Sequence, residues 1–160
     1  MLEGRTNYPQ SPEALVELYE FRRAIEIPAA RLAAERRTPD QMARIKSAWR
    51  DCELAVKRDS ADEFAQLFHA SIVDAAHNRF FRECYRSLQD PFARNVTLIL
   101  GQGQLRSMLH FHDDLIASIE RRDAKAAERA VEENFRETDV RLQLLLQDGN
   151  NAVTTNKRRR

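Results

Sequence analysis

Hydrophobic residues recur at intervals of three and four along most of the chain, which is the spacing of one face of an α-helix. Four such stripes are clear: Leu15, Leu18 and Ile25; Phe64, Leu67, Phe68, Ile72 and Ala75; Met108, Leu115, Ile116 and Ile119; and Val131, Phe135, Thr138 and Leu142. No alternation of apolar and polar residues typical of a β-strand continues beyond a few positions. The pattern predicts an all-α fold, an antiparallel bundle of about six to seven helices joined by short loops.

Capping residues indicate where these helices begin and end. Five residues stand as N-caps at expected helix starts: Ser11, Thr38, Ser60, Asn78 and Asp123. Thr38 and Ser60 are each followed three residues later by Gln or Glu, the arrangement of a capping box. Pro28 is expected to kink or break the first helix, because proline lacks the backbone N–H that a helix interior requires. The last helix is expected to fray after Asp148 and Gly149.

Polar side chains interrupt the apolar stripes of four different helices: Arg22, His69, His112 and Asn134. His112, for example, follows Met108 by four residues and precedes Leu115 by three. Singly, an arginine can extend to solvent, an asparagine can cap a neighbouring helix, and a histidine can bond a backbone carbonyl. Because an unpartnered buried polar group costs about 1–3 kcal/mol, the four together predict a polar cavity inside the bundle. Such a cavity would hold a small ligand, a metal ion or both.

The composition is that of an ordinary globular chain forming one domain, with 42% hydrophobic and 32% charged residues. The net charge is +1, but Lys157 and Arg158 to Arg160 form a basic tail, and the rest is slightly acidic and therefore a poor phosphate binder. No apolar run approaches the ~18 residues of a membrane span, and residues 1–10 lack the hydrophobic part of a signal peptide. Cys52 and Cys84 form no CxxC pair, which favours a reducing, cytoplasmic location.

Sequence signatures of enzymes are missing. The chain contains no Glu-x-x-His, no HExxH, no GxSxG, no P-loop and no GxGxxG. His77 is interpreted as a helix end and His110 as part of a solvated face. The sequence therefore predicts that the protein is not an enzyme. Two alternatives remain, a metal-dependent enzyme built on His69 and His112, and a purely structural helical partner protein.

Three segments in this order, LYEFRRAIEIPAARLAAER, FHASIVDAAHN and HDDLIASIERRDAKAAERAVEENF, carry a resemblance to a known family. From about residue 11 to residue 146 the chain resembles the C-terminal effector domain of GntR-type transcription regulators of the FadR subfamily. The segments AAHN and QDPFARNV are most similar to members that sense pyruvate, lactate or glycolate. The resemblance implies an effector-binding and dimerisation domain over residues 11–148, preceded by a linker remnant over residues 1–10. The basic residues at the end of the chain predict a disordered basic tail over residues 149–160.

The same resemblance implies how the protein works. Family members form homodimers, bind a small carboxylate in an all-helical bundle, and thereby control the binding of an N-terminal winged helix-turn-helix to operator DNA. That DNA-binding domain is expected upstream of residue 1 and is not present in this chain. Arg22 matches the family's arginine on the first helix, whose planar fork suits a carboxylate.

Many members also hold a divalent metal, of the zinc or nickel class, with one aspartate and three histidines. In this sequence those positions fall on Ala65, His69, His112 and Asn134. Two of the four ligands are thus replaced, and an amide oxygen is a weaker ligand than imidazole for such ions. The resemblance therefore implies a partial metal site on His69 and His112. Without an ion, His69, His112 and Asn134 would contact the effector directly.

Overall fold

The computed structural model describes residues 12–56, 62–87 and 109–157, and these are almost entirely helical. The helices are α1 (Pro12–Arg36), α2 (Pro39–Val56), α3 (Asp62–Ala75), α4 (Arg79–Ser87), α6 (Leu109–Glu120) and α7 (Ala124–Lys157). No strand occurs in these ranges, so the prediction of an all-α fold is confirmed. The expected caps at Ser11 and Ser60 lie outside the described residues, as do the side chains of Ala65 and His110.

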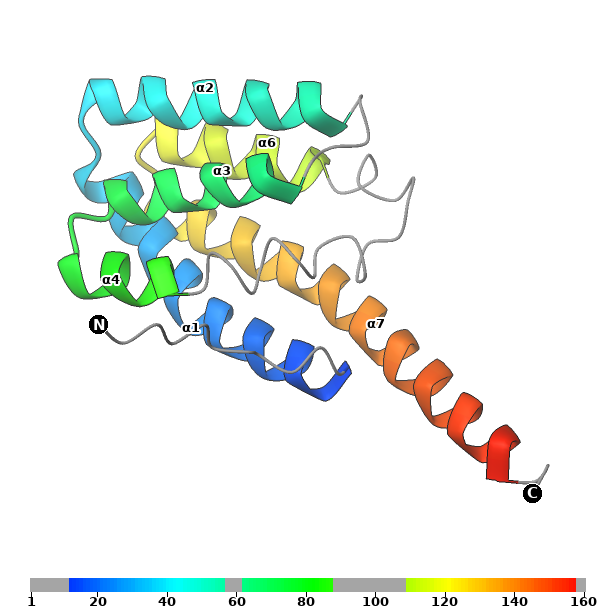
Figure 1. The fold of residues 1–160 in the computed structure, drawn as a ribbon. Helices are drawn as coiled ribbons and strands as arrows, with labels where there is room; N and C mark the ends of the chain where they lie inside the picture. Colours follow the sequence, from blue (N-terminus) through cyan, green and yellow to red (C-terminus); the bar gives the residue numbers. More distant parts are fainter. Residues whose placement is uncertain (1–11, 57–61, 88–108, 158–160) are drawn as a thin grey trace, which may run out of the picture.

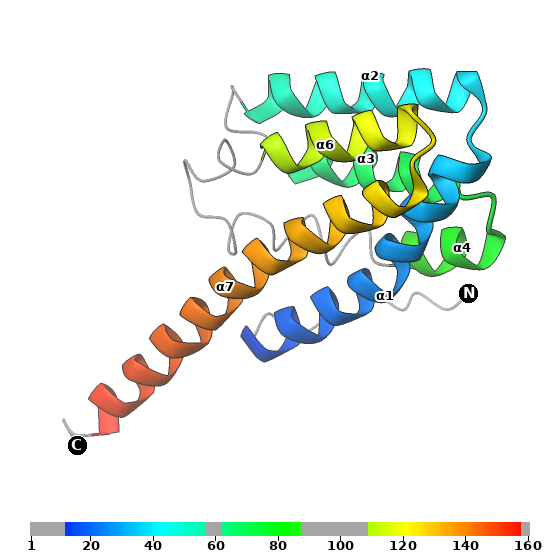
Figure 2. The same ribbon diagram turned by 180° about the vertical axis from the view of Figure 1, so that it is seen from behind.

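The helices form a bundle in which α3 and α6 lie inside, between α2 and the pair formed by α1 and α7 (Figures 1 and 2). α1 and α7 pack along each other, and the C-terminal half of α7 projects beyond the other helices (Figure 1). The short helix α4 lies against α3 and α1 at the opposite end. This arrangement turns one face of α1, α3, α6 and α7 toward a common interior.

The core consists of two apolar clusters that meet at this interior. The larger joins α1, α2, α3, α6 and α7 around fully buried side chains such as Ile45, Phe68 and Ile119. α1 contributes mainly alanines on this face, which lets neighbouring helices approach closely. The smaller cluster fixes α4 against α1 and α3 and includes Ile25, Val73 and Tyr85.

Three of the predicted caps are confirmed by their hydrogen bonds. In the capping box that opens α2, the backbone N–H of Thr38 donates to Gln41 Oε1 over 2.9 Å, and the N–H of Gln41 donates to Thr38 Oγ1 over 3.1 Å. Asn78 Oδ1 accepts from the N–H groups of Phe80 and Phe81 at the start of α4. At the start of α7, Asp123 Oδ1 accepts from the N–H of Ala126 over 2.9 Å. These caps satisfy donors that a helix start otherwise leaves unpaired.

Two expected helix ends do not occur, namely a break at Pro28 and the fraying after Asp148 and Gly149. α1 continues through Pro28 without a break, because the buried residues around the proline hold the helix on the core. The carbonyl of Ala24, which loses its helical partner, belongs to an exposed residue that water can solvate. α7 continues past Asp148 and Gly149 to Lys157 instead of giving way to a disordered tail at 149. A single glycine costs a helix only about 1 kcal/mol relative to alanine, which does not end it.

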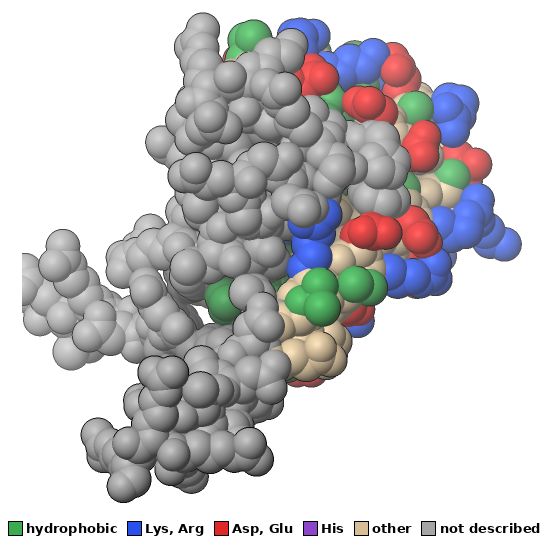
Figure 3. Space-filling model, turned by 90° about the vertical axis from the view of Figure 1, so that its right-hand side faces the viewer, with side chains coloured by type: hydrophobic (Ala, Val, Ile, Leu, Met, Phe, Trp, Pro, Cys, Tyr) green, Lys and Arg blue, Asp and Glu red, His purple; other side chains and the backbone are tan. Residues whose placement is uncertain are grey.

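The described surface carries both signs of charge. On the face drawn in Figure 3, Lys and Arg side chains alternate with Asp and Glu, and no histidine is visible. No helix in the described part of the chain combines the length and the apolar character that crossing a membrane requires. The chemically distinctive side chains therefore have to be sought in the interior.

Candidate functional site

Arg22 and Glu26 form a buried ion pair on the inward face of α1. Arg22 Nε donates to Glu26 Oε1 over 2.7 Å, and both side chains are only 5% exposed. The guanidinium also lies over the ring of Tyr19, 4.7 Å from its centroid, and 5.7 Å from that of Phe135 on α7. Burial disfavours the charged guanidinium, but the adjacent Glu26 carboxylate outweighs this and raises the pKa of Arg22. Arg22 is therefore a permanent positive charge inside the bundle.

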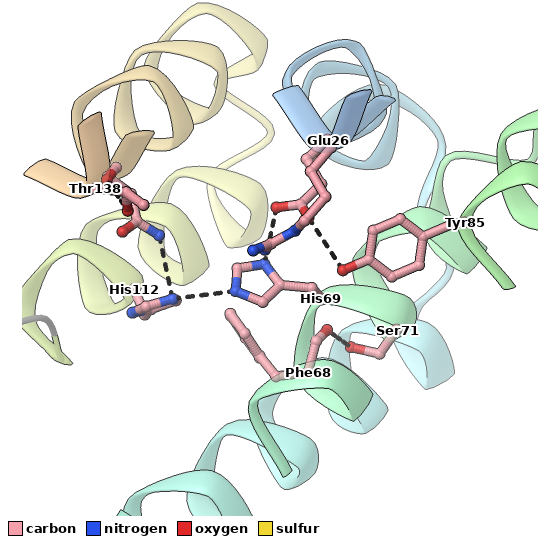
Figure 4. A network of polar contacts seen from close by, with 9 residues as sticks. Glu26, Phe68, His69, Ser71, Tyr85, His112 and Thr138 are labelled. Carbon is pink, nitrogen blue, oxygen red and sulfur yellow. Dashed lines mark hydrogen bonds and ion pairs between the residues drawn. The ribbon is translucent and has the colours of Figure 1, made fainter. Parts of the chain in front are cut away.

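Glu26 connects α1 with α3 and α4. Its Oε1 also accepts a hydrogen bond from Tyr85 Oη of α4 over 3.0 Å, and its Oε2 lies 3.2 Å from His69 Nδ1 of α3 (Figure 4). Burial raises the pKa of Tyr85, helped by Glu26, so the hydroxyl keeps its proton and donates it. Burial, followed by the positive charge of Arg22, lowers the pKa of His69 well below its ordinary value. His69 is consequently a neutral imidazole at neutral pH.

The other ring nitrogen of His69 faces α6 and α7. His69 Nε2 lies 3.3 Å from His112 Nε2, and His112 Nε2 lies 3.3 Å from Asn134 Nδ2. The second polar atom of the amide, Asn134 Oδ1, is buried and has no hydrogen-bond partner among the described residues. We call these three converging side chains the imidazole–amide junction. An orphaned buried oxygen is costly, so the junction is suited to an additional polar group or ion.

Aromatic rings enclose His112. The ring of Trp49 on α2 stacks on it at a centroid distance of 4.7 Å and an interplanar angle of 24°, and Phe68 meets it edge-on at 5.3 Å. Trp49 is itself fixed by a hydrogen bond from its Nε1 to Asp113 Oδ1 over 3.0 Å. The imidazole of His112 is therefore held in one orientation, with Nε2 directed at the junction (Figure 4).

The interior space beside this network is small. A cavity of about 10 Å³ borders Glu26 and His69 and is otherwise lined by Ile72, Val73, Leu115 and Val131. That volume is about what a single water molecule needs. A molecule the size of a small carboxylic acid would therefore have to move the surrounding helices in order to enter beside the described residues.

Comparison with known proteins identifies the fold family. The FCD domain family matches residues 17–137, about three quarters of the chain. The chain belongs to this family. FCD domains are effector-binding domains of GntR-type transcription regulators, which are not enzymes. Nothing in the described residues supports the alternative of a metal-dependent enzyme.

The FCD domain is also similar to solved structures. One is E. coli McbR/YncC, which matches with a TM-score of 0.66 and 16% sequence identity, over 88% of this chain and 67% of that one. At this level of identity the similarity concerns the fold. No curated protein matches the sequence.

Within this FCD domain, the four predicted site residues lie in one connected cluster. Arg22 contacts His69 through Glu26, and His69 contacts Asn134 through His112. The sequence analysis missed Glu26 and Tyr85 as site residues. Glu26 could have been found, because it lies four residues after Arg22 on the same helical face. Tyr85 gives no such signal. His77, as predicted, ends its helix: it is exposed, follows α3 and has a φ of 53°.

Proposed function

We propose that this FCD domain senses a small carboxylate of the pyruvate, lactate or glycolate class inside the bundle. The observation that carries the proposal is Arg22, a guanidinium held charged in the interior by Glu26, whose other oxygen contacts His69, which in turn lies 3.3 Å from His112. Such a buried cation is a natural partner for a carboxylate, which it can bind with two parallel hydrogen bonds. In this arrangement the effector shares or takes over the guanidinium that Glu26 now engages.

The closed interior supports a sensing role. Because the cavity beside Glu26 and His69 has room for about one water, an effector binds only to a bundle whose helices have separated slightly. A ligand with different affinities for two helix packings shifts the balance between them. In our proposal this shift is passed to an N-terminal winged helix-turn-helix and changes its affinity for operator DNA. The protein acts as a homodimer of the FadR subfamily.

A divalent ion of the zinc or nickel class is part of this proposal, held by His69, His112 and the amide of Asn134. Two nitrogen ligands, each about 2.1 Å from a tetrahedral ion, lie roughly 3.4 Å apart, and the Nε2 atoms of His69 and His112 are 3.3 Å apart. Turning the amide of Asn134 by 180° would present the orphaned oxygen, since the two amide atoms are interchangeable by rotation. The described residues contain no group of three His, Cys, Asp or Glu side chains suited to a metal, so the site would be a weak one. Such an ion would supply a second positive centre for the effector carboxylate.

Isothermal titration calorimetry with pyruvate, L-lactate and glycolate tests the proposal. We expect one of the three to bind the unmodified protein, and Arg22→Lys to bind it about 10–100-fold more weakly, since a hydrogen bond to a charged group contributes about 1.5–3 kcal/mol. Lysine keeps the charge but loses the planar fork. The matched control is Arg31→Lys, because Arg31 forms an exposed pair with Glu35 on the same helix. Equal affinities of Arg22→Lys and the unmodified protein would exclude Arg22 as the anchor.

A further inference from the structure

The two carboxylate oxygens of Glu26 have different neighbours. Oε1 receives two hydrogen bonds, from Arg22 Nε over 2.7 Å and from Tyr85 Oη over 3.0 Å, whereas Oε2 lies 3.2 Å from His69 Nδ1. All four side chains are more than nine-tenths buried. Since two donors from two different helices converge on Oε1, the carboxylate is fixed with Oε2 directed at His69.

A carboxylate oxygen carries only electron pairs, so a ring nitrogen 3.2 Å away is favoured in its protonated form over its bare form, which would be repelled. A neutral imidazole carries one proton, and Nε2 is then left with an unshared electron pair. We infer that Glu26 is a positioning residue that selects the Nδ1–H tautomer of His69, so that His69 presents a bare Nε2 to the imidazole–amide junction. Arg22 and Tyr85 serve this role indirectly by holding Glu26 in place.

This tautomer determines what the junction can bind. With the amide of Asn134 oriented so that Nδ2 donates to His112 Nε2, both Nε2 atoms are acceptors and face each other across 3.3 Å, and a cation removes this excess of acceptors. With the amide turned, His112 Nε2 carries the proton and donates it to the bare Nε2 of His69. In both orientations His69 Nε2 offers an electron pair to the junction. A carboxylate that orients a histidine from behind is the usual support of a metal-binding imidazole. The inference rests on the proposed function, in that Glu26 prepares His69 for the proposed ion.

The tautomer can be measured directly on the unmodified protein. The protein is labelled with ¹⁵N-histidine, freed of metal by dialysis against a chelator, and examined near neutral pH by long-range ¹H–¹⁵N correlation spectroscopy. The resonances of His69 are assigned by their loss in His69→Gln. We expect His69 to carry its proton on Nδ1. A proton on Nε2 overturns the inference, whatever ligands the protein binds.

Glu26→Gln provides the sharper test, because it changes one atom and should reverse the tautomer. The donors Arg22 Nε and Tyr85 Oη both point at Oε1, so the new amide places its oxygen there and its NH₂ group toward His69 Nδ1. His69 then accepts at Nδ1 and carries its proton on Nε2, where it donates to His112. The spectrum should show the opposite tautomer, and the affinity for Zn²⁺ measured by calorimetry should fall about 10–100-fold.

Glu35→Gln is the matched control, since Glu35 is the exposed acceptor of the other Arg–Glu pair on α1. It should change neither the His69 spectrum nor Zn²⁺ binding. An unchanged His69 tautomer in folded Glu26→Gln overturns the inference, and if that variant does not fold, the spectrum of the unmodified protein decides.

The outcomes distinguish failure of the inference from failure of the proposed function. A His69 that carries its proton on Nδ1, in a protein that binds neither Zn²⁺ nor a carboxylate, refutes the proposed function alone. The Nε2–H form in a protein that does bind them refutes only the role of Glu26.

Discussion

Two Arg–Glu pairs on α1 share the same spacing of four residues but differ in burial, and they allow the interior charge to be tested against a matched control. Arg22 and Glu26 are 2.7 Å apart and 5% exposed, whereas Arg31 and Glu35 are 3.4 Å apart and 57% and 42% exposed. We expect Arg22→Met to lower the free energy of unfolding by about 3–5 kcal/mol, because it leaves a buried carboxylate without its counter-charge. Arg31→Met should cost about 0.5 kcal/mol or less.

The structure narrows the expected loss of unfolding free energy for Arg22→Met. Methionine retains an unbranched apolar side chain that can pack against Tyr19 and Phe135, so little of the loss comes from packing. Glu26 also keeps its contact with His69 and its hydrogen bond from Tyr85, and a hydrogen bond to a charged group contributes about 1.5–3 kcal/mol. The loss should therefore lie near the lower limit, about 3 kcal/mol. Replacing both partners, as in Arg22→Met with Glu26→Leu, should restore part of the stability, since no buried charge remains.

Urea unfolding followed by far-UV circular dichroism measures these differences, with the m-value checked for constancy across the variants. The reasoning is refuted if Arg22→Met and Arg31→Met lose the same amount, below about 1 kcal/mol. It is also refuted if adding Glu26→Leu to Arg22→Met lowers the free energy of unfolding further, by the full cost of a second core substitution. Either result would mean that the buried pair is not held together by its charges.

Three further predictions concern single features. Thr38→Ala removes one half of the capping box of α2 and should cost about 1 kcal/mol in the same urea assay; no loss would mean that the cap is dispensable. Burial, with a smaller effect of Glu53, raises the pKa of Cys52 to about 12, while Cys84 is exposed, so at pH ~8 a thiol reagent should modify one cysteine in the folded protein and two after denaturation. Zn²⁺ should change the fluorescence of Trp49, the sole tryptophan, which stacks on His112; His112→Ala should abolish the change, and an unresponsive unmodified protein would argue against an ion at His112.

Much of the fold could be predicted from the sequence because the signals were local. The caps at Thr38, Asn78 and Asp123 act within three residues. Helical periodicity alone placed the four polar side chains on the faces of their helices that the structure turns inward. The continuation of α1 through Pro28 was not predictable in this way, since packing against other helices overrides the local preference of the proline.

The missed part of the site depends on contacts between distant segments. Tyr85 reaches Glu26 across 59 positions of sequence, and nothing near Tyr85 indicates that its hydroxyl is buried against a carboxylate. Glu26 was overlooked for a different reason. An Arg–Glu pair four residues apart is the common arrangement on exposed helix surfaces, as Arg31 and Glu35 show, and only the inward position of Arg22 on the apolar stripe marks Glu26 as part of a buried pair.

Glu26 also gives a way to decide which positive centre binds the effector. The guanidinium of Arg22 already faces an internal carboxylate, so an incoming carboxylate has to compete with Glu26 for it. Glu26→Gln removes this competing charge and leaves the guanidinium charge uncompensated, while it should weaken Zn²⁺ binding at His69.

If Arg22 is the anchor, calorimetry on the metal-free variant should show the effector binding about tenfold tighter than to the unmodified protein, a gain of about 1.4 kcal/mol. If the ion is the anchor, effector binding in the presence of Zn²⁺ should weaken in parallel with the Zn²⁺ affinity. A metal-free variant that binds no more tightly than the unmodified protein would contradict the role of Arg22, because relief from a carboxylate at 2.7 Å has to favour any carboxylate that takes its place.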